Sequence, residues 1–449
     1  MPHRKRLDAG LIVTHSFRQL VVLVTGLLRG VYDSAKRRIK TATQMDQEAA
    51  LWTSEVQYDA YYGREKVRSY PDGLRVATDY SDYGHVRGLR DPDAGQTYWT
   101  LSGQDAWGHP TLESYGNGLS GLHSSYASTG QVKKRYWSGS AGLLDQWDYT
   151  YDSFANLTRQ THSYRSGSAT VSSGESYAYD SLQRLTQASR SVGGSVSYGY
   201  TASGNLDSKS DYSKAQPGAY VYHEGGCGPH FVTGVWLPNG SKATYTCDAN
   251  GNVTGGNTLY AWYDTASLPR SINRLGVGTA EFLYAPSGER FRQIASGAKT
   301  FYGPDGYEKT FDGFGVTTRH ELGPVVVTRT YGREAVYAAL RDRLGSTVAL
   351  ADRNGYVTER RSYDAFGAVR GADFAPRYGG GLNLSPATRR GFTGHEHLDD
   401  VRLIHMNGRA YDYTLGRFLS VDPFLRFPAN GFRAPRAARP GRAGRSTWS

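Results

Sequence analysis

The sequence has few of the residues that build disulfide frameworks and cysteine-based metal centres. Its 449 residues include 2 cysteines and 3 methionines. Two cysteines are too few for a disulfide scaffold or for a cysteine cluster around a metal. We expect Cys227 and Cys247 to be two buried thiols rather than an isolated disulfide, because Cys247 stands where comparable segments carry tyrosine.

The one candidate membrane segment is too short to cross a membrane as a helix. An apolar stretch at residues 20–28 follows a basic start at Arg4-Lys5-Arg6 and is closed by Arg29. A spanning helix needs about 20 apolar residues, and no small-residue cleavage site follows cleanly, as a signal peptide requires. We expect residues 1–50 to form a separate basic and apolar segment with a short amphipathic helix, with a signal peptide as the alternative.

Familiar catalytic motifs are also missing. The chain shows no phosphate-binding loop, no nucleophile elbow and no Cys/His nucleophile pair. His395 and His397, with His405 further on, come nearest to a set of metal ligands, but a strand does not give them the helical spacing of zinc proteases. We expect ordinary strand histidines, no metal site and no cofactor.

Tyrosine and glycine are abundant. There are 34 tyrosines and 55 glycines, while hydrophobic residues make up only 38% of the chain. Tyrosine suits a pleated surface, because its ring packs on one face while its hydroxyl reaches water. This composition predicts an all-β fold with a large sheet surface and many tight turns.

The positive charge is concentrated at the two ends. The net charge is +11, and the first forty residues are basic. Residues 431–449 contain no acidic residue and carry Arg433, Arg436, Arg439, Arg442 and Arg445. Because the middle of the chain is close to neutral, we expect no specific nucleic-acid partner, and we expect residues 425–449 to form a disordered low-complexity tail.

A recurring unit runs through the middle of the chain. Its form is Tyr-x-Tyr-Asp-x-x-Gly-x-Leu, and clear copies occur at residues 149–157, 177–185, 198–206 and 245–253. We expect the aspartate to cap a tight turn, the glycine position to accept a positive φ and the leucine to begin the return strand. Hairpins that each cover the face of a neighbour predict a long β-strip that coils into a spiral or a partial shell.

Four ordered motifs follow between residues 341 and 424. They are Arg343-Leu344-Gly345-Ser346-Thr347, Tyr363-Asp364-Ala365-Phe366-Gly367, Gly391-Phe392-Thr393-Gly394-His395-Glu396 and the segment at residues 411–423. Together they resemble the core of bacterial RHS/YD-repeat proteins, which include teneurin-like shells. The resemblance divides the chain into an N-terminal segment (1–50), a YD-repeat β-strip (51–340), a repeat-associated core (341–424) and a tail (425–449).

The resemblance also implies a function. Complete RHS proteins are hollow β-shells that enclose and release a C-terminal toxin, and this chain resembles a C-terminal shell fragment without the toxin or the completed cleavage sequence. The partners it implies are the remainder of an RHS shell, an enclosed toxin segment and a secretion-system component. It implies a secreted or cell-surface location and no enzymatic activity for the fragment itself.

The family resemblance suggests one catalytic reading, aspartyl self-cleavage. That chemistry needs two carboxylates that share a proton. By position in the last motif, Asp422 is the first candidate and Asp412 the second, with Arg409 as a charge partner. Turn capping is the favoured alternative role for both aspartates.

Exposed aromatic residues would support a different function, a carbohydrate-binding or adhesion module. Rings on an open sheet face can stack on sugars, whereas packed rings cannot. We expect most of the following tryptophans to be packed: Trp99, Trp107, Trp137, Trp147, Trp236 and Trp262.

Overall fold

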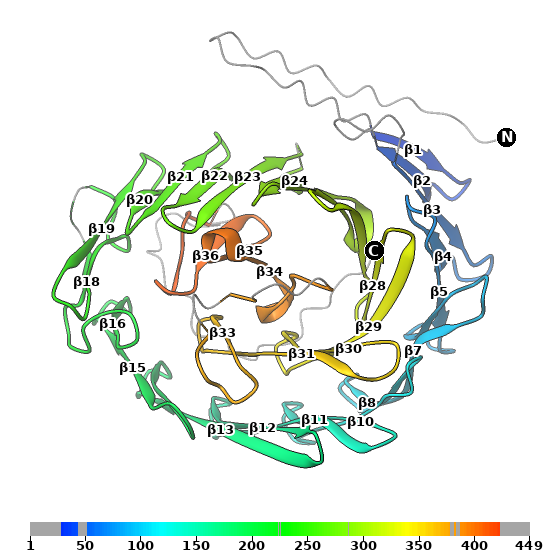
Figure 1. Cartoon of the computed structure of the whole chain (residues 1–449), viewed down its shortest axis with the longest axis horizontal. Helices are drawn as coiled ribbons and strands as arrows, with labels where there is room; N and C mark the ends of the chain where they lie inside the picture. Colours follow the sequence, from blue (N-terminus) through cyan, green and yellow to red (C-terminus); the bar gives the residue numbers. More distant parts are fainter. Residues whose placement is uncertain are drawn as a thin grey trace, which may run out of the picture.

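The chain forms one long strip of antiparallel strands that winds into a spiral. A computed structural model describes residues 28–43, 52–222, 224, 226–285, 287–377, 381–382 and 387–422. Within each of its two long sheets, every strand is hydrogen-bonded to the next one in sequence, and the strip curls so that its last part lies inside its first part (Figure 1). The all-β fold and the coiled hairpin strip are therefore confirmed.

The first sheet has 16 strands in sequence order. They are β1 (Leu28–Tyr32), β2 (Arg38–Thr43), β3 (Trp52–Tyr58), β4 (Glu65–Ser69), β5 (Arg75–Tyr80), β6 (Val86–Arg90), β7 (Thr97–Gln104), β8 (Pro110–Tyr115), β9 (Ser120–Ser125), β10 (Val132–Gly139), β11 (Gly142–Tyr151), β12 (Leu157–Ser166), β13 (Ala169–Tyr179), β14 (Leu185–Arg190), β15 (Ser195–Tyr200) and β16 (Leu206–Lys209).

The second sheet has 15 strands, also in sequence order. They are β17 (Tyr220–Tyr222), β18 (Val232–Trp236), β19 (Lys242–Cys247), β20 (Val253–Gly256), β21 (Leu259–Tyr263), β22 (Pro269–Arg274), β23 (Gly278–Tyr284), β24 (Arg290–Ala295), β25 (Ala298–Tyr302), β26 (Tyr307–Asp312), β27 (Gly315–Glu321), β28 (Val325–Thr330), β29 (Arg333–Arg341), β30 (Thr347–Ala351) and β31 (Val357–Arg360), with the 3-10 turn η1 (Pro304–Gly306) before β26. The expected boundary after residue 340 falls at β29, inside this sheet.

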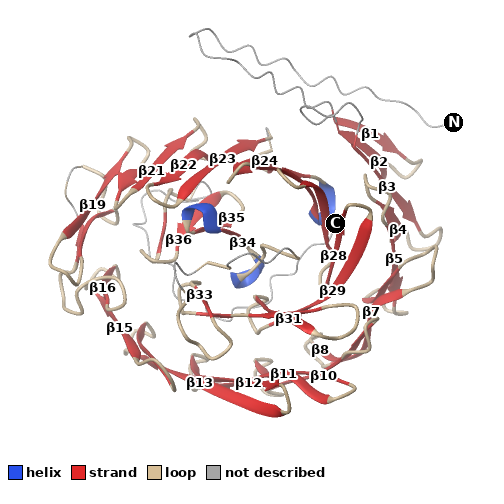
Figure 2. Ribbon diagram, viewed as in Figure 1, coloured by secondary structure: helices blue, strands red, loops and turns tan. Residues whose placement is uncertain are grey.

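Two further, small sheets lie in the interior of the spiral (Figure 2). The first pairs β32 (Ser362–Tyr363) with β33 (Val369–Arg370), and the second joins β34 (Glu396–Leu398), β35 (Leu403–Met406), β36 (Arg409–Asp412) and β37 (Arg417–Phe418). The 3-10 turns η3 (Phe392–Gly394) and η4 (Asp399–Val401) lie before and after β34.

The hairpin turns form as the repeat predicts. One Asp152 carboxylate oxygen accepts the backbone N–H groups of Phe154 and Asn156, each at 2.9 Å, and Leu157 begins β12. Ala155 stands at the glycine position of this unit and has φ 70°. The second tyrosine of a unit joins its strand to the neighbouring strand. In one unit, the Tyr179 hydroxyl donates to the backbone oxygen of Leu157 at 2.9 Å.

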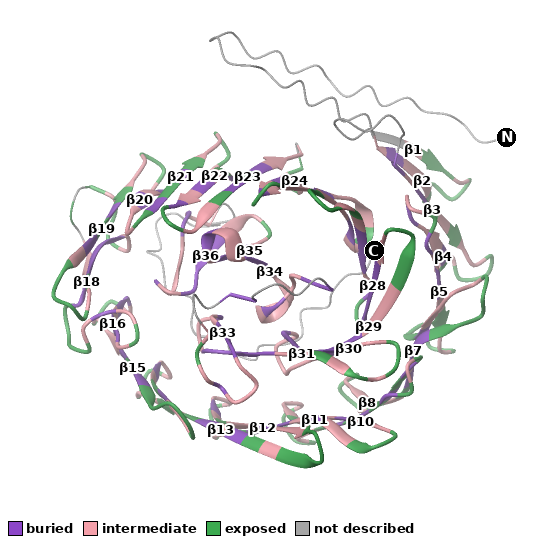
Figure 3. Cartoon of the chain, viewed as in Figure 1, coloured by how far each residue is buried: buried purple, intermediate pink, exposed green. Residues whose placement is uncertain are grey.

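The hydrophobic core lies between the layers of the spiral. One buried cluster joins Trp137 and Tyr149 of the first sheet with Val327 and Leu340 of the second. Buried residues follow the strands of both layers, whereas many hairpin turns are exposed (Figure 3). The sequence predicted that hairpins would cover each other's apolar faces. In the structure, the inner and outer layers of the spiral cover each other's apolar faces.

The start of the chain corrects one expectation. Residues 28–43 form the hairpin β1–β2 rather than a helix, and Asp33 caps its turn by accepting the N–H groups of Ala35 and Arg37. Tyr32-Asp33 is thus a further copy of the repeat, with Lys36 at the glycine position at φ 62°. The rest of the predicted N-terminal helix and the predicted tail at residues 425–449 lie outside the described residues.

The cysteines correct a second expectation. Cys227 and Cys247 form a disulfide, with their Cα atoms 5.8 Å apart. Cys247 replaces the second tyrosine of its unit, and a cysteine is too short to reach the neighbouring backbone as Tyr179 does. The loop after β17 instead brings Cys227 back to it.

Candidate functional site

The three residues expected at a self-cleavage site lie on the small interior sheet or just after it. β36 begins after the turn at Asn407 and Gly408, where Asn407 has φ 59°, and it ends at Asp412. One Asp412 oxygen accepts the N–H groups of Thr414 and Leu415, each at 2.9 Å. This is the same capped turn as in the repeats, so turn capping by Asp412 is observed.

The other Asp412 oxygen lies 2.9 Å from the guanidinium of Arg274 on β22, and both residues are almost fully buried. Arg274 also donates to the backbone oxygen of Val401 at 2.8 Å. Burial by itself lowers the pKa of Arg274, but the Asp412 carboxylate raises it above its ordinary value. The pair is therefore a charged tie between the interior sheet and the wall of the spiral.

Asp422 has a different partner. Its carboxylate lies 3.1 Å from Arg409, and its side chain is 40% exposed. The Arg409 guanidinium also stacks on the ring of Phe418, 3.7 Å from the ring centre. Burial lowers the pKa of Arg409, and the charge of Asp422 opposes that shift.

The structure thus brings Arg409 and Asp422 together and places Asp412 on Arg274. An aspartyl protease pair needs two carboxylates close enough to share one proton. Here each carboxylate forms its own ion pair with an arginine. In this arrangement Asp412 joins the interior sheet to β22, and Asp422 pairs with Arg409 of the interior sheet itself.

A cluster of buried ions, which sequence reasoning missed, surrounds the motif at residues 391–396. Glu396 pairs with Arg290 and accepts the hydroxyl of Tyr302 at 2.9 Å. Although burial raises the pKa of Glu396, neighbouring arginines, with Arg290 foremost, lower it below its ordinary value, so this carboxylate is charged. The motif therefore carries one half of an ion pair whose other half lies on β24.

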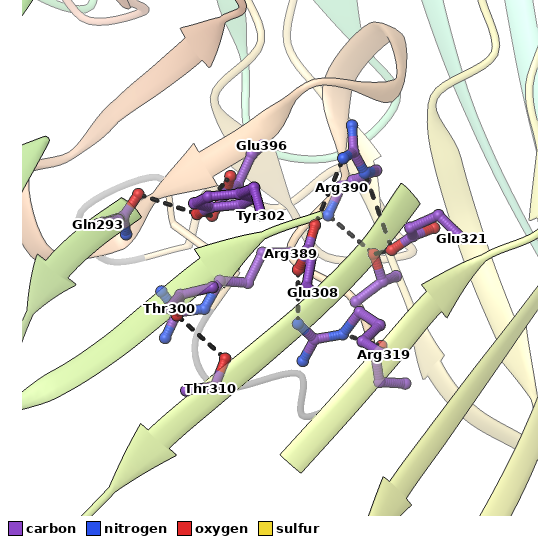
Figure 4. Close-up of polar contacts among 12 residues, drawn as sticks. Gln293, Thr300, Tyr302, Glu308, Thr310, Arg319, Glu321, Arg389, Arg390 and Glu396 are labelled. Carbon is purple, nitrogen blue, oxygen red and sulfur yellow. Dashed lines mark hydrogen bonds and ion pairs between the residues drawn. The ribbon is translucent and has the colours of Figure 1, made fainter. Parts of the chain in front are cut away.

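A second part of the cluster joins the core to β26 and β27. Glu308 accepts from Arg319 at 2.9 Å and from Arg390 at 3.3 Å, and Arg390 also lies 4.0 Å from Glu321 (Figure 4). Arg390 lies far in sequence from its partners on β26 and β27, so no local sequence motif predicts these ion pairs.

His397 and His405 in this region are buried and form hydrogen bonds within the protein. His397 Nε2 accepts the N–H of Phe392 at 3.1 Å, and burial lowers the pKa of His397 to about 3. His405 Nε2 lies 3.0 Å from the hydroxyl of Tyr284. In the described part of the chain, no group of three or more His, Cys, Asp or Glu residues is arranged to hold a metal ion.

Further buried ion pairs tie the core to the first sheet. Asp145 of β11 lies 3.1 Å from both His162 and Arg360, and Glu175 of β13 lies 2.7 Å from Arg370. His162 also faces the backbone oxygen of Ala372 through Nδ1, at 2.7 Å. His162 therefore contacts β11 through one ring nitrogen and the core through the other.

The tryptophans divide into two sets. Trp99, Trp137 and Trp147 are buried between the layers, as expected. Trp107, Trp236 and Trp262 are exposed by 56%, 38% and 56%. Trp262 shares the outer face of β21 with exposed Tyr260, so the outer wall keeps an aromatic surface.

No helix in the described ranges has the length and apolar character that crossing a membrane requires.

Comparison with protein-family models finds no matching family, and comparison with curated proteins finds no match. The solved structures give the informative result.

The chain is similar in structure to the TcdB2–TccC3 toxin complexes. It matches the complex without its hypervariable C-terminal region with a TM-score of 0.68 at 15% identity, over 89% of this chain. It matches the Photorhabdus luminescens Tc holotoxin pore with a TM-score of 0.67 at 16% identity, over 90% of this chain. In both cases it spans about 22% of the length of the matched chain. The chain therefore has the fold of an RHS-repeat β-shell.

Proposed function

We propose that this chain is a structural container of the RHS type, which encloses a polypeptide and is not itself an enzyme. The observation that carries the proposal is the interior position of the core, which buried ion pairs fasten to both sheets of the wall. A wall with so many fixed internal contacts is suited to holding a shape around a bound segment.

The proposed cargo is polypeptide that follows the core. The backbone oxygen of Leu419 accepts the N–H of Val253 at 2.7 Å and the hydroxyl of Tyr263 at 3.1 Å. The end of the core is thus fastened to the wall at Leu419, and the segment that follows the core starts from a fixed point. We also propose two further partners, the remainder of an RHS shell and a secretion-system component.

We also propose a secreted or cell-surface location. The disulfide between Cys227 and Cys247 supports it, because such bonds form and persist mainly in oxidising compartments.

Trypsin tests the enclosure. Residues 426–445 contain several arginines, so an unprotected tail would be cut at once. An isotope-labelled synthetic peptide of residues 423–449, added to the same tube, serves as the unprotected control. We expect the peptide to be cut at least about 100-fold faster than the tail of the folded chain. Equal rates would reject the enclosure of this segment.

A self-cleaving aspartyl site is the second candidate, favoured by the ion pair of Arg409 with Asp422 beside the end of the core. Intact-mass measurement of the purified chain over several days tests it. Cleavage near the C-terminus that disappears in Asp422→Asn but persists in Asp412→Asn would assign the role to Asp422. An uncut chain leaves Asp412, Asp422 and Arg409 with structural roles in their ion pairs.

A glycan-binding role is the third candidate, and the exposed pair Tyr260 and Trp262 favours it. A glycan array with the wild-type chain and Trp262→Ala tests this surface. Binding that is lost in the variant supports adhesion, whereas no binding by the wild-type chain rejects it.

A further inference from the structure

The two long edges of the first sheet carry different residues. In a strip of sequential antiparallel hairpins, every turn from an odd-numbered strand to the next even-numbered strand lies on the same edge. The tips of these turns carry exposed apolar side chains, which we call the apolar rim: Tyr61 (89% exposed), Tyr83 (91%), Trp107 (56%), Phe154 (71%) and Leu182 (63%).

The turn geometry aims these side chains outward. Each lies two residues after the residue that begins its turn, and in four of the five turns that residue is an aspartate whose carboxylate accepts the backbone N–H of the rim residue. Turns on one edge are two strands apart, or about 10 Å. The rim from Tyr61 to Leu182 is therefore a row about 48 Å long. The turn between β9 and β10 has no apolar tip of its own, and Trp107 fills the gap by packing on Gly130.

The opposite edge lacks such a row. Its turns consist mainly of glycine, serine, asparagine and aspartate, and Val192 (59% exposed) is the only large apolar residue exposed at a turn tip there among the described residues of the first sheet. In the second sheet, the equivalent positions of the β19–β20, β21–β22 and β23–β24 turns hold Asn250, Ala266 and Ser287, whereas turns on its other edge expose Leu275 (55%), Phe314 (86%) and Tyr331 (69%). Within the first sheet, the apolar rim is thus confined to one edge.

Inside the spiral, one turn carries an apolar residue at the same position as the rim residues, and this residue is covered by another strand. Phe366 lies two residues after Asp364, whose carboxylate accepts its N–H at 2.8 Å. Its ring centre lies 5.3 Å from that of Tyr198 and 5.6 Å from the ammonium of Lys209, and it is only partly exposed. Where this turn position is apolar inside the spiral, another layer of β-strip covers it.

Charge and area favour a second copy of this chain as the cover for the rim. Two of the four rim aspartates pair with an arginine, Asp59 with Arg64 and Asp180 with Arg184. The rim therefore offers little to a strongly acidic or basic partner. At about 200 Å² for each aromatic side chain, the four rings expose roughly 600 Å². A stable interface buries about 800 Å² on each partner.

We propose that two copies of this chain join apolar rim to apolar rim about a two-fold axis that lies between the β7–β8 and β9–β10 turns. This axis sets Tyr83 of each copy opposite Phe154 of the other, and Tyr61 opposite Leu182. Such an interface is isologous, as in most homodimers. It makes a tube two strips tall, and it does not depend on whether the container holds a cargo.

Sedimentation equilibrium between about 0.1 and 100 µM tests the interface. We expect the wild-type chain to be a dimer and Phe154→Glu to raise the dimer Kd at least about 100-fold, because a charge replaces a central apolar contact twice. Adding Tyr83→Lys to Phe154→Glu should restore the dimer, since lysine and glutamate then face each other. Val192→Glu on the opposite edge is the matched control and should leave the Kd unchanged.

Three outcomes would overturn the proposal. They are a wild-type monomer at 100 µM, a Phe154→Glu variant with the wild-type Kd, and a Val192→Glu variant as weak as Phe154→Glu. A double variant that stays monomeric would reject the stated axis. Circular dichroism of each variant shows that the β-strip is folded, and the trypsin experiment on the tail tests the container role separately.

Discussion

The buried carboxylate of Glu113 should be among the most sensitive single sites in the wall. It lies on the inner face of the first sheet and accepts from four side chains: Trp99 at 2.8 Å, Tyr115 at 2.8 Å, His123 at 2.9 Å and Trp137 at 3.3 Å. His123 Nδ1 accepts the backbone N–H of Tyr136, so its Nε2 carries the hydrogen that it donates. A charged carboxylate is the one side-chain group of this size that can accept all four.

The pKa of Glu113 shows the direction of the pH effect. Burial alone raises this pKa, but the hydrogen bonds, with that from His123 foremost, lower it from 4.5 to about 2. A group with a lowered folded-state pKa stabilises the protein above its unfolded pKa and loses that contribution as pH falls. A shift of this size corresponds to about 3 kcal/mol, present above pH 4.5 and lost toward pH 2.

Glu113→Gln removes this contribution while keeping the shape of the side chain. One amide oxygen cannot serve four donors, and the amide NH₂ adds two more, so at least two buried donors lose their acceptor. At about 1 to 3 kcal/mol for each, we expect a loss of about 3 to 5 kcal/mol of unfolding free energy at pH 7. Urea unfolding followed by tryptophan fluorescence measures it, because Trp99 and Trp137 contact the site.

The control is Glu281→Gln, at an exposed position, which should stay within about 0.5 kcal/mol of the wild type. Unfolding between pH 6 and pH 2 should show a steep loss in the wild type below pH 4.5 that is smaller in Glu113→Gln. A variant within 1 kcal/mol of the wild type, or with the same loss below pH 4.5, would refute the reasoning.

Three further predictions concern the turns, the disulfide and the layer contacts. Ala155→Gly should stabilise the chain by about 1 kcal/mol because Ala155 has φ 70°, whereas Gly204→Ala at φ 86° should destabilise it by a similar amount; calorimetric Tm values check the signs. Cys247→Ser should lower the unfolding free energy by about 3 kcal/mol, and the wild type in dithiothreitol should melt like the variant. Arg370→Met should cost about 3 to 5 kcal/mol, because Glu175 then stays buried without its cation 2.7 Å away, and hydrogen exchange should speed up in β32 and β33 but not in β1–β8.

Each of these predictions has a contrary result. Equal Tm shifts of one sign for both turn variants would refute the role of φ, and an unchanged Tm in dithiothreitol would refute the role of the disulfide. Uniform exchange along the chain of Arg370→Met would show that the core and the wall open as one unit.

Sequence reasoning predicted the local structure because each repeat specifies its own hairpin. The aspartate at 152 caps its turn and the leucine at 157 begins a strand for reasons that lie within nine residues of chain. The same reasoning missed the hairpin at residues 28–43, because the apolar run at residues 20–28 favoured a helix there. The Tyr32-Asp33 pair, which matches the repeat, was the signal that could have predicted the hairpin.

The contacts between layers could not be predicted in this way. Which residue of the core meets Asp145 or Glu175 depends on the curvature of the whole strip, and no local pattern sets that curvature. The same limit applies to Asp412, whose place in the last motif suggested catalysis, while its partner Arg274 lies far upstream in the sequence. The disulfide was missed because its formation depends on the path of the loop after β17.

The interior position of the core sets the order in which the chain can fold. His162 meets Ala372 across 210 residues of sequence, and His320 meets Asp72 across 248. Contacts of such high sequence separation form slowly, whereas each hairpin of the strip closes locally. The ribosome delivers the wall before the core. Each new molecule therefore presents strands of the first sheet with an uncovered apolar face until the strands that cover them have left the ribosome, and a chaperone that shields that face would act in this interval.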